Sequence, residues 1–182
     1  KTINGGVNWT KGINAPYGDI ASIHFFDSNT GLAVSNYAHA IVFSSNNGFI
    51  WKTTDHGSNW IQKLITQNDQ TITSLKMVNS ATGFAVGMNK IFKTTNQGEG
   101  WQIDSLNNTK LTSVFFSNPQ TGWLTGGSGA ILKTTNTGEN WIQYGASTTK
   151  HLNSAFFIDN NIGYVCGDSG VVCRTTNGGL NW

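Results

Sequence analysis

Short apolar runs separated by polar, glycine-rich turns make up the whole chain. One unit shows the pattern clearly, with apolar runs at residues 111–116, 123–126, 130–135 and 142–144. Aromatic and β-branched residues are frequent in these runs, and no stretch repeats apolar residues at helical spacing. The pattern therefore predicts an all-β chain of short antiparallel strands joined by tight turns.

A nine-residue stretch sets the phase of this pattern. Residues 133–141 read Lys-Thr-Thr-Asn-Thr-Gly-Glu-Asn-Trp, and related stretches end at Trp9, Trp60, Trp101 and Trp182. The five tryptophans are 51, 41, 40 and 41 residues apart. Four short strands repeated about every 40 residues are typical of β-propeller blades. A β-sandwich is the alternative fold, but it gives no reason for one turn to recur at a fixed period.

We therefore predict one β-propeller domain over residues 1–182, with about four blades of four-stranded antiparallel sheet. The repeats are expected at 10–60, 61–101, 102–141 and 142–182, with 1–9 as the end of a preceding repeat. Residues 10–15 could complete the last blade and close a ring of four. The chain has a copy of the nine-residue stretch at each end, and a closed ring of four would need only one of these two copies. This favours a fragment of a larger propeller.

The first spacing is longer because one turn expands. Residues 127–129 join the second and third strands of the third unit, whereas residues 36–48 join them in the first. The insertion fits a small hairpin that extends the blade, or a degenerate copy of the nine-residue stretch at 44–51. Tyr37 and His39 open the one loop that departs from the short form, so they are our first choice for a ligand contact.

The residue types of the repeated stretch are those of a tight turn. Asp or Asn can accept bonds from nearby backbone amides, Gly can take a positive φ, and the Thr hydroxyl can add a local bond. The tryptophan is expected to anchor the hairpin on the blade. We therefore assign a structural role to Asn4, Gly6, Trp9, Asp55, Gly57, Trp60, Asn96, Gly98, Trp101, Asn136, Gly138, Trp141, Asn177, Gly179 and Trp182.

These stretches resemble the Asp-box, or bacterial neuraminidase repeat. The form Lys-Thr-Thr-Asn-x-Gly-x-Asn-Trp, with Thr-Gly-Trp or Thr-Gly-Phe upstream, is most similar to the photosystem II stability/assembly factor-like propellers. The resemblance covers essentially the whole chain. It implies that the box is a structural hairpin away from the ligand, and it implies an extracytoplasmic or secreted bacterial protein. A shared fold does not transmit activity, so the ligand stays open.

Composition narrows the classes of partner. Eleven basic and nine acidic residues give a net charge of +2 with no basic cluster, so we expect no nucleic-acid partner. No apolar run approaches the roughly 18 residues of a membrane span, so we expect no membrane insertion. Cys166 and Cys173 flank a predicted turn in a diagonal relationship, which suits two small buried side chains better than a disulfide.

The residue sets needed for catalysis or metal binding do not assemble in this sequence. A sialidase-like site needs three arginines, whereas the single Arg174 aligns with Lys133 as an ordinary strand position. A glycosidase needs two placed carboxylates. The other acidic residues fall in boxes, on a strand or in the turn after a first strand, on the box rim, which leaves Asp19, Asp69 and Asp168. The histidines show no metal-ligand spacing. We therefore predict no catalytic residue, no metal and no cofactor.

The expected topology locates a binding surface. Antiparallel strands place the boxes on one rim, and they place the turns between second and third strands, with the blade crossovers, on the other. Candidate ligand contacts on that second rim are Tyr37, His39, Asp19, Asp69, Lys110, His151 and Asp168. The prediction is a non-catalytic binding or scaffold module that recognises a protein or glycan through this rim. The alternative is a fragment of a xyloglucanase-like or sialidase-like Asp-box hydrolase whose catalytic residues lie outside this chain.

Overall fold

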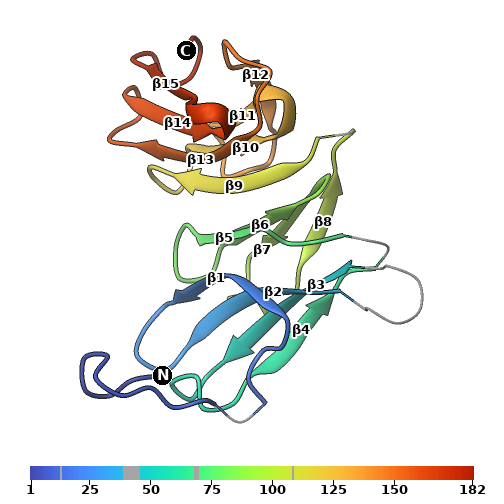
Figure 1. Cartoon of the computed structure of the whole chain (residues 1–182), viewed down its shortest axis with the longest axis vertical. Coiled ribbons are helices and arrows are strands. Elements are labelled where there is room, and N and C mark those ends of the chain that lie inside the picture. Colours follow the sequence, from blue (N-terminus) through green and yellow to red (C-terminus); the bar gives the residue numbers. More distant parts are fainter. Residues whose placement is uncertain (13, 39–45, 68–69, 108) are drawn as a thin grey trace.

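Four β-sheets follow one another along the long axis of the molecule (Figure 1). The computed structural model describes residues 1–182 except 13, 39–45, 68–69 and 108. The sheets at the N-terminal and C-terminal ends of the chain lie at opposite ends of the stack. The predicted all-β propeller fold is confirmed as a partial propeller, an open arc of blades in which the four sheets do not close a ring.

Each sheet is an antiparallel meander in sequence order. The first contains β1 (Asp19–Phe25), β2 (Gly31–Ala38), β3 (Asn46–Thr53) and β4 (Ile61–Ile65). The second contains β5 (Ser74–Met77), β6 (Gly83–Gly87), β7 (Lys90–Thr94) and β8 (Gln102–Ser105). The third contains β9 (Leu111–Phe116), β10 (Gly122–Gly126), the 3₁₀ turn η1 (Gly127–Gly129), β11 (Ala130–Thr134) and β12 (Ile142–Gly145). The fourth contains β13 (Leu152–Phe157), β14 (Gly163–Gly167), η2 (Asp168–Gly170) and β15 (Val172–Thr175).

The insertion of the first repeat lengthens the β2–β3 hairpin. Backbone pairing between β2 and β3 continues without a shift out to Ala38 with Asn46. β3 therefore begins at Asn46, so the hairpin interpretation holds, and the degenerate box considered at 44–51 is not formed by the described part of that segment. Residues 39–45 lie outside the described residues.

Each junction between neighbouring sheets repeats the same packing. At the third junction Trp123 and Ile131, from the second and third strands of one sheet, pack on Leu152, Ala155 and Phe157 of the next. The equivalent clusters combine Phe84, Val86 and Ile91 with Leu111, Val114 and Phe116, and Leu32, Val34 and Ile50 with Ile72, Leu75 and Met77. Stacking therefore removes from water the apolar faces that a single blade would leave exposed.

The five boxes form the same hydrogen-bonded turn. In the box between β11 and β12, Gly138 N donates to Thr134 Oγ1 at 2.9 Å and Asn140 N donates to Asn136 Oδ1 at 3.1 Å. Equivalent bonds recur in the boxes at 1–9, 52–60, 93–101 and 174–182. The polar side chains are occupied within the turn, which supports the structural interpretation of the box.

The turn places two consecutive residues at positive φ. Thr137 has a φ of 56° and Gly138 a φ of 70°. The residues equivalent to Thr137 in three other boxes, His56, Gln97 and Gly178, also have a positive φ. Sequence reasoning assigned this conformation to the glycine alone. Turns of the I′ kind need positive φ at both central positions, because their twist matches that of the flanking strands.

The box tryptophans differ in burial. Trp60 is buried and Trp101, Trp141 and Trp182 are half-buried, whereas Trp9 is 72% exposed. Trp60 and Trp182 meet an aromatic side chain of the first strand of their own sheet edge-on, at ring-centroid distances of 6.1 and 5.8 Å. The expected anchoring does not extend to Trp9, which is mostly exposed and stacks on no aromatic ring in the part of the chain that the structure describes.

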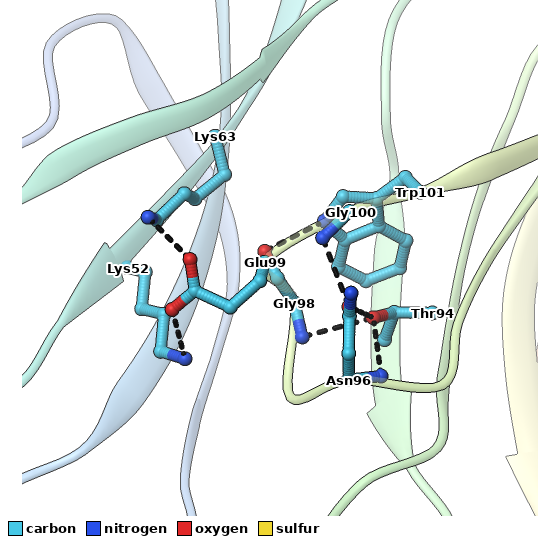
Figure 2. Close-up of polar contacts among 8 residues, drawn as sticks. All are labelled: Lys52, Lys63, Thr94, Asn96, Gly98, Glu99, Gly100 and Trp101. Atoms are coloured by element: carbon cyan, nitrogen blue, oxygen red, sulfur yellow. Dashed lines mark hydrogen bonds and ion pairs between the residues drawn. The ribbon is translucent and has the colours of Figure 1, made fainter.

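Ion pairs join a box to the preceding sheet (Figure 2). Glu99 binds Lys52 Nζ at 2.7 Å and Lys63 Nζ at 2.6 Å, and these bonds lower the pKa of the Glu99 carboxyl to about 2. Glu139 binds Lys93 Nζ at 2.8 Å in the next junction. Box glutamates therefore connect consecutive blades at two of the three junctions.

The third junction lacks this carboxylate. Lys133 is equivalent to Lys52 in the repeat, but the residue of the last box that is equivalent to Glu99 is Leu180. Lys133 has no carboxylate partner among the described residues, lies 5.5 Å from the centroid of the Trp123 ring, and has a pKa lowered by burial. It lines a hollow of about 560 Å³ with Tyr144, which aligns with Lys63.

Leu180→Glu should therefore stabilise the chain by up to about 1 kcal/mol, because it restores the missing ion pair at a partly exposed site. Denaturant unfolding at low and high salt measures this, and the gain should shrink as salt rises. Leu180→Gln is the matched control, since it removes the same apolar side chain without adding charge. Equal stability of the Glu and Gln variants would contradict the expected pair.

Candidate functional site

An aromatic hollow lies on the rim opposite the boxes, at the first sheet. It measures about 460 Å³ and is lined by Tyr17, Tyr37, Asn47, Phe49 and Ile65. The Tyr17 and Tyr37 rings meet edge to face with centroids 5.7 Å apart, and Tyr17 meets Phe49 at 5.0 Å. We call this set of five residues the Tyr17 hollow.

Two features of the local sequence bring the tyrosines together. The lengthened hairpin carries β2 far enough to place Tyr37 at the rim. Gly18, with a φ of 82°, then lets the incoming chain approach β2, since a Cβ at Gly18 would lie 2.2 Å from Asn36 O. A glycine is required here for both the φ and the close approach.

The next blade holds the base of this hairpin in place. Asn36 Nδ2 donates to Ile72 O at 2.8 Å, and Ile72 N donates to Asn36 Oδ1 at 2.7 Å. Both backbone groups of one residue are thus bound by a single side-chain amide. This contact fixes the strand that carries Tyr37 against the second sheet.

The hollow combines exposed rings with a polar atom that has no partner. The exposed fractions are 48% for Tyr17 and 39% for Tyr37, while Phe49 is buried beneath them. Asn47 Oδ1 is buried and has no hydrogen-bond partner among the described residues. Because a buried oxygen without a partner is costly, a ligand that donates a hydrogen bond here would be favoured.

The other predicted contacts fall into two groups. Asp19 begins β1 opposite Asn36, near the Tyr17 hollow, whereas Lys110, His151 and Asp168 belong to the third and fourth sheets. Lys110 lines a separate hollow of about 300 Å³. Asp168 accepts a bond from Asn153 Nδ2 at 2.9 Å, and its backbone N donates to His151 O at 2.9 Å. His39 and Asp69 lie outside the described residues.

Sequence reasoning therefore found part of the hollow. Tyr37 was selected on the length of its loop, whereas Tyr17 was not selected. Asn47 and Phe49 were missed because their positions read as turn and strand residues. The signal that could have found them is the alternation along the extended hairpin, which puts Tyr37 opposite Asn47 in the register.

Other chemistry is not assembled in the described part of the chain. Those residues hold no group of three or more His, Cys, Asp or Glu side chains arranged to bind a metal, and no helix among them is both long and apolar enough to cross a membrane. Asp19 and Asp168 belong to the first and fourth sheets, so the structure does not bring these two acids together.

The cysteines differ from expectation. Cys166 pairs with Val172 and Cys173 with Val165, so the two side chains point to opposite faces of the sheet. Both are free thiols, and Cys166 is exposed. The prediction of two small buried side chains is therefore wrong, because Cys166 is exposed and Cys173 is half-buried.

One family model matches part of the chain. The model described as photosynthesis system II assembly factor YCF48 matches residues 95–182. A search of curated proteins finds no match.

Several solved structures share the fold. YCF48 from Cyanidioschyzon merolae superposes with a TM-score of 0.65 at 16% identity, covering 94% of this chain and 61% of that one. An ancestral GH74 enzyme superposes with a TM-score of 0.59 at 16% identity, covering 91% of this chain and 27% of that one. The computationally designed Ika4 protein superposes with a TM-score of 0.66 at 11% identity, covering 94% of this chain and 99% of that one. At these identities the likeness is one of fold, and the present chain spans less than two thirds of the length of YCF48.

Proposed function

Because this chain is an Asp-box β-propeller related to the photosystem II assembly factor family, we propose that it is a non-catalytic module that binds a protein partner through the Tyr17 hollow. The observation that carries the proposal is the hollow itself, in which two exposed tyrosine rings adjoin the buried Asn47 Oδ1, which has no hydrogen-bond partner in the described part of the chain. An assembly factor acts by binding the proteins that it assembles, so a rigid binding rim is the feature such a function needs.

The residue types of the hollow suit a protein segment. Tyrosines supply large contact area at little cost in side-chain entropy, and they are enriched where proteins bind one another. The Asn47 oxygen would accept a bond from a backbone N–H of an extended peptide, which offers such donors at regular spacing. The proposed contact is therefore a peptide segment that places an apolar side chain between the rings and an N–H on Asn47.

The opposite rim is less suited to binding. The Thr, Asp and Asn side chains of the boxes accept the hydrogen bonds of their own turns, so few polar groups remain for a ligand. The alternative of an Asp-box hydrolase has the GH74 fold in its favour, but fold alone does not transmit activity. Among the described residues, Asp19 and Asp168 belong to different sheets and do not form the acid pair that a glycosidase needs.

Tyr37→Ala should weaken binding of a peptide selected on the whole chain by roughly tenfold or more, which is about 1.4 kcal/mol. A phage-displayed library of random peptides supplies the probe, and fluorescence anisotropy with a selected peptide measures the affinity. Tyr17→Ala should have a similar effect. The loss arises because each ring forms a wall of the hollow.

Tyr144→Ala is the matched control, since Tyr144 lies on β12, away from the Tyr17 hollow. Thermal unfolding of each variant separates lost binding from lost stability. Selected peptides that bind all three variants like the parent chain would contradict the proposed site. A library that yields no binder, while a glycan array yields ligands dependent on Tyr17 and Tyr37, would replace the protein partner with a carbohydrate.

A further inference from the structure

A short turn on the rim opposite the boxes holds basic side chains around a residue that has no side chain. The turn is η1, which joins β10 to β11. Gly127 N donates to Lys110 O at 2.8 Å, and Gly129 N donates to Lys150 O at 2.8 Å. Lys110 directly precedes the third sheet, and Lys150 lies just before the fourth. The two bonds therefore hold both crossovers, with their lysines, beside one turn.

Two side chains flank the bare position at Gly127. A Cβ built there would lie 3.4 Å from His151 Nδ1 and 3.7 Å from Lys110 Cβ. These are ordinary contact distances, so an atom fits beside both side chains without displacing either. Ser128, in the middle of the turn, is exposed. We call Lys110, Gly127, Ser128, Lys150 and His151 the Gly127 notch.

The basic groups of the notch have no acidic partner in the described part of the chain. Lys52 and Lys93 bind box glutamates at 2.7 and 2.8 Å. In contrast, Lys110 Nζ, Lys150 Nζ and the His151 ring form no ion pair or hydrogen bond with any described residue. Two ammonium groups, an imidazole and a hydroxyl can all donate hydrogen bonds, so the notch suits an anion.

The equivalent turn of the fourth sheet has a carboxylate at this place. η2 begins with Asp168 where η1 begins with Gly127. Asp168 N donates to His151 O at 2.9 Å, just as Gly127 N donates to Lys110 O. The Asp168 carboxylate accepts a bond from Asn153 Nδ2 at 2.9 Å. The turn therefore accommodates a carboxylate at its first position, and the third sheet has no side chain there.

The notch lies at an internal place in the stack (Figure 1). Its residues belong to the third sheet and to the crossovers before and after that sheet, and the second and fourth sheets lie on either side. Lys110 also lines a hollow of about 300 Å³ with Met88, Asn89 and Thr109. An extended peptide on this rim therefore has room beside the notch.

We propose that the Gly127 notch binds the side-chain carboxylate of a glutamate or aspartate in an acidic peptide segment. The carboxylate enters beside Gly127 and accepts hydrogen bonds from the Lys110 ammonium, the His151 imidazole and the Ser128 hydroxyl. Lys150 adds positive charge next to it. The site is separate from the Tyr17 hollow, which lies on the first sheet, so it stands whether or not that hollow binds a peptide.

A fluorescein-labelled oligoglutamate peptide with an amidated C-terminus is the probe. Fluorescence anisotropy with the whole chain at low salt measures its affinity, and oligoglutamine with the same ends should not bind. The affinity should fall as salt rises, because the contact joins exposed charges. Oligoglutamine with a free C-terminus tests the other source of a carboxylate. If it binds as tightly as oligoglutamate, the assignment to an acidic side chain is overturned.

Gly127→Asp should weaken oligoglutamate binding by roughly tenfold, because its own carboxylate takes the place of the peptide's. Gly127 does not have a positive φ, so this change adds no backbone strain of that kind. Lys110→Gln and His151→Asn should each weaken binding by about threefold, since each removes one donor to an exposed carboxylate.

Lys11→Gln is the matched control, because it removes the same charge from an exposed lysine outside the notch. This variant should bind oligoglutamate like the parent chain. Tyr17→Ala should do so as well, which distinguishes this site from the Tyr17 hollow.

Circular dichroism and thermal unfolding check that each variant keeps the fold. If Gly127→Asp does not fold, Lys110→Gln and His151→Asn decide the test. Three results would overturn the proposal: a parent chain that does not bind oligoglutamate at low salt, a folded Gly127→Asp chain that binds it like the parent, or a Lys11→Gln chain that loses as much affinity as Lys110→Gln.

Discussion

Trp123→Ala should destabilise the chain by about 3 to 5 kcal/mol, the largest effect expected of any single truncation here. Trp123 is fully buried, stacks on Phe157 at a centroid distance of 3.5 Å, and donates from Nε1 to Gly178 O at 3.1 Å. Its removal leaves a cavity at the third junction and an unsatisfied carbonyl beneath the last box. Urea unfolding followed by tryptophan fluorescence and circular dichroism measures the loss.

Two other tryptophans provide the comparison. Trp141 is half-buried, so Trp141→Ala should cost less than Trp123→Ala, although Trp141 belongs to the repeated box pattern and Trp123 does not. Trp9 is mostly exposed, so Trp9→Ala should change stability by no more than about 0.5 kcal/mol. An order in which the box tryptophans outweigh Trp123 would show that the box, and not the blade junction, dominates stability.

Gly138→Ala should cost about 2 to 4 kcal/mol, because two separate penalties add at this position. Gly138 has a φ of 70°, which an L side chain adopts with strain, and a Cβ there would lie 2.5 Å from the Phe84 ring. Phe84 is fully buried between sheets, so its ring cannot move aside into solvent. Equilibrium unfolding in urea measures the total.

Gly170→Ala separates the two penalties. Gly170 has a φ of 74°, but a Cβ built there meets nothing within 4 Å. This variant should therefore show the backbone strain alone, about 1 to 2 kcal/mol. If Gly138→Ala and Gly170→Ala cost the same, the close approach of the box glycine to the preceding blade contributes nothing to stability.

Much of the fold follows from local pattern. The nine-residue stretch predicts the phase of the strands because its Thr, Asn and Gly make a turn whose bonds lie within the stretch itself, as between Gly138 and Thr134. The expected strands at 111–116, 123–126 and 130–135 accordingly match β9, β10 and β11 to within one or two residues. Local hydrogen bonds and alternation act over a few residues, so they are readable without the tertiary structure.

The site was only partly predictable. The length of the insertion pointed to Tyr37, but nothing local couples Tyr17 to Phe49 or buries Asn47 Oδ1 with no partner among the residues that the structure describes. These contacts depend on the path of the chain before β1 and on the close approach at Gly18. They join segments about 30 residues apart, and such pairings are set by packing and not by local sequence preference.

The sequence by itself determined the repeat, the turn and the order of strands, because each of these rests on interactions within one blade. Only the tertiary structure decided which apolar residues are covered, since both faces of a blade are apolar and their burial depends on the neighbouring sheet. Phe157 and Phe25 hold equivalent places in the repeat, yet Phe157 is buried under Trp123 and Phe25 is 41% exposed. The difference lies in the neighbour, which stands about 40 residues away in the chain and is invisible to any local pattern.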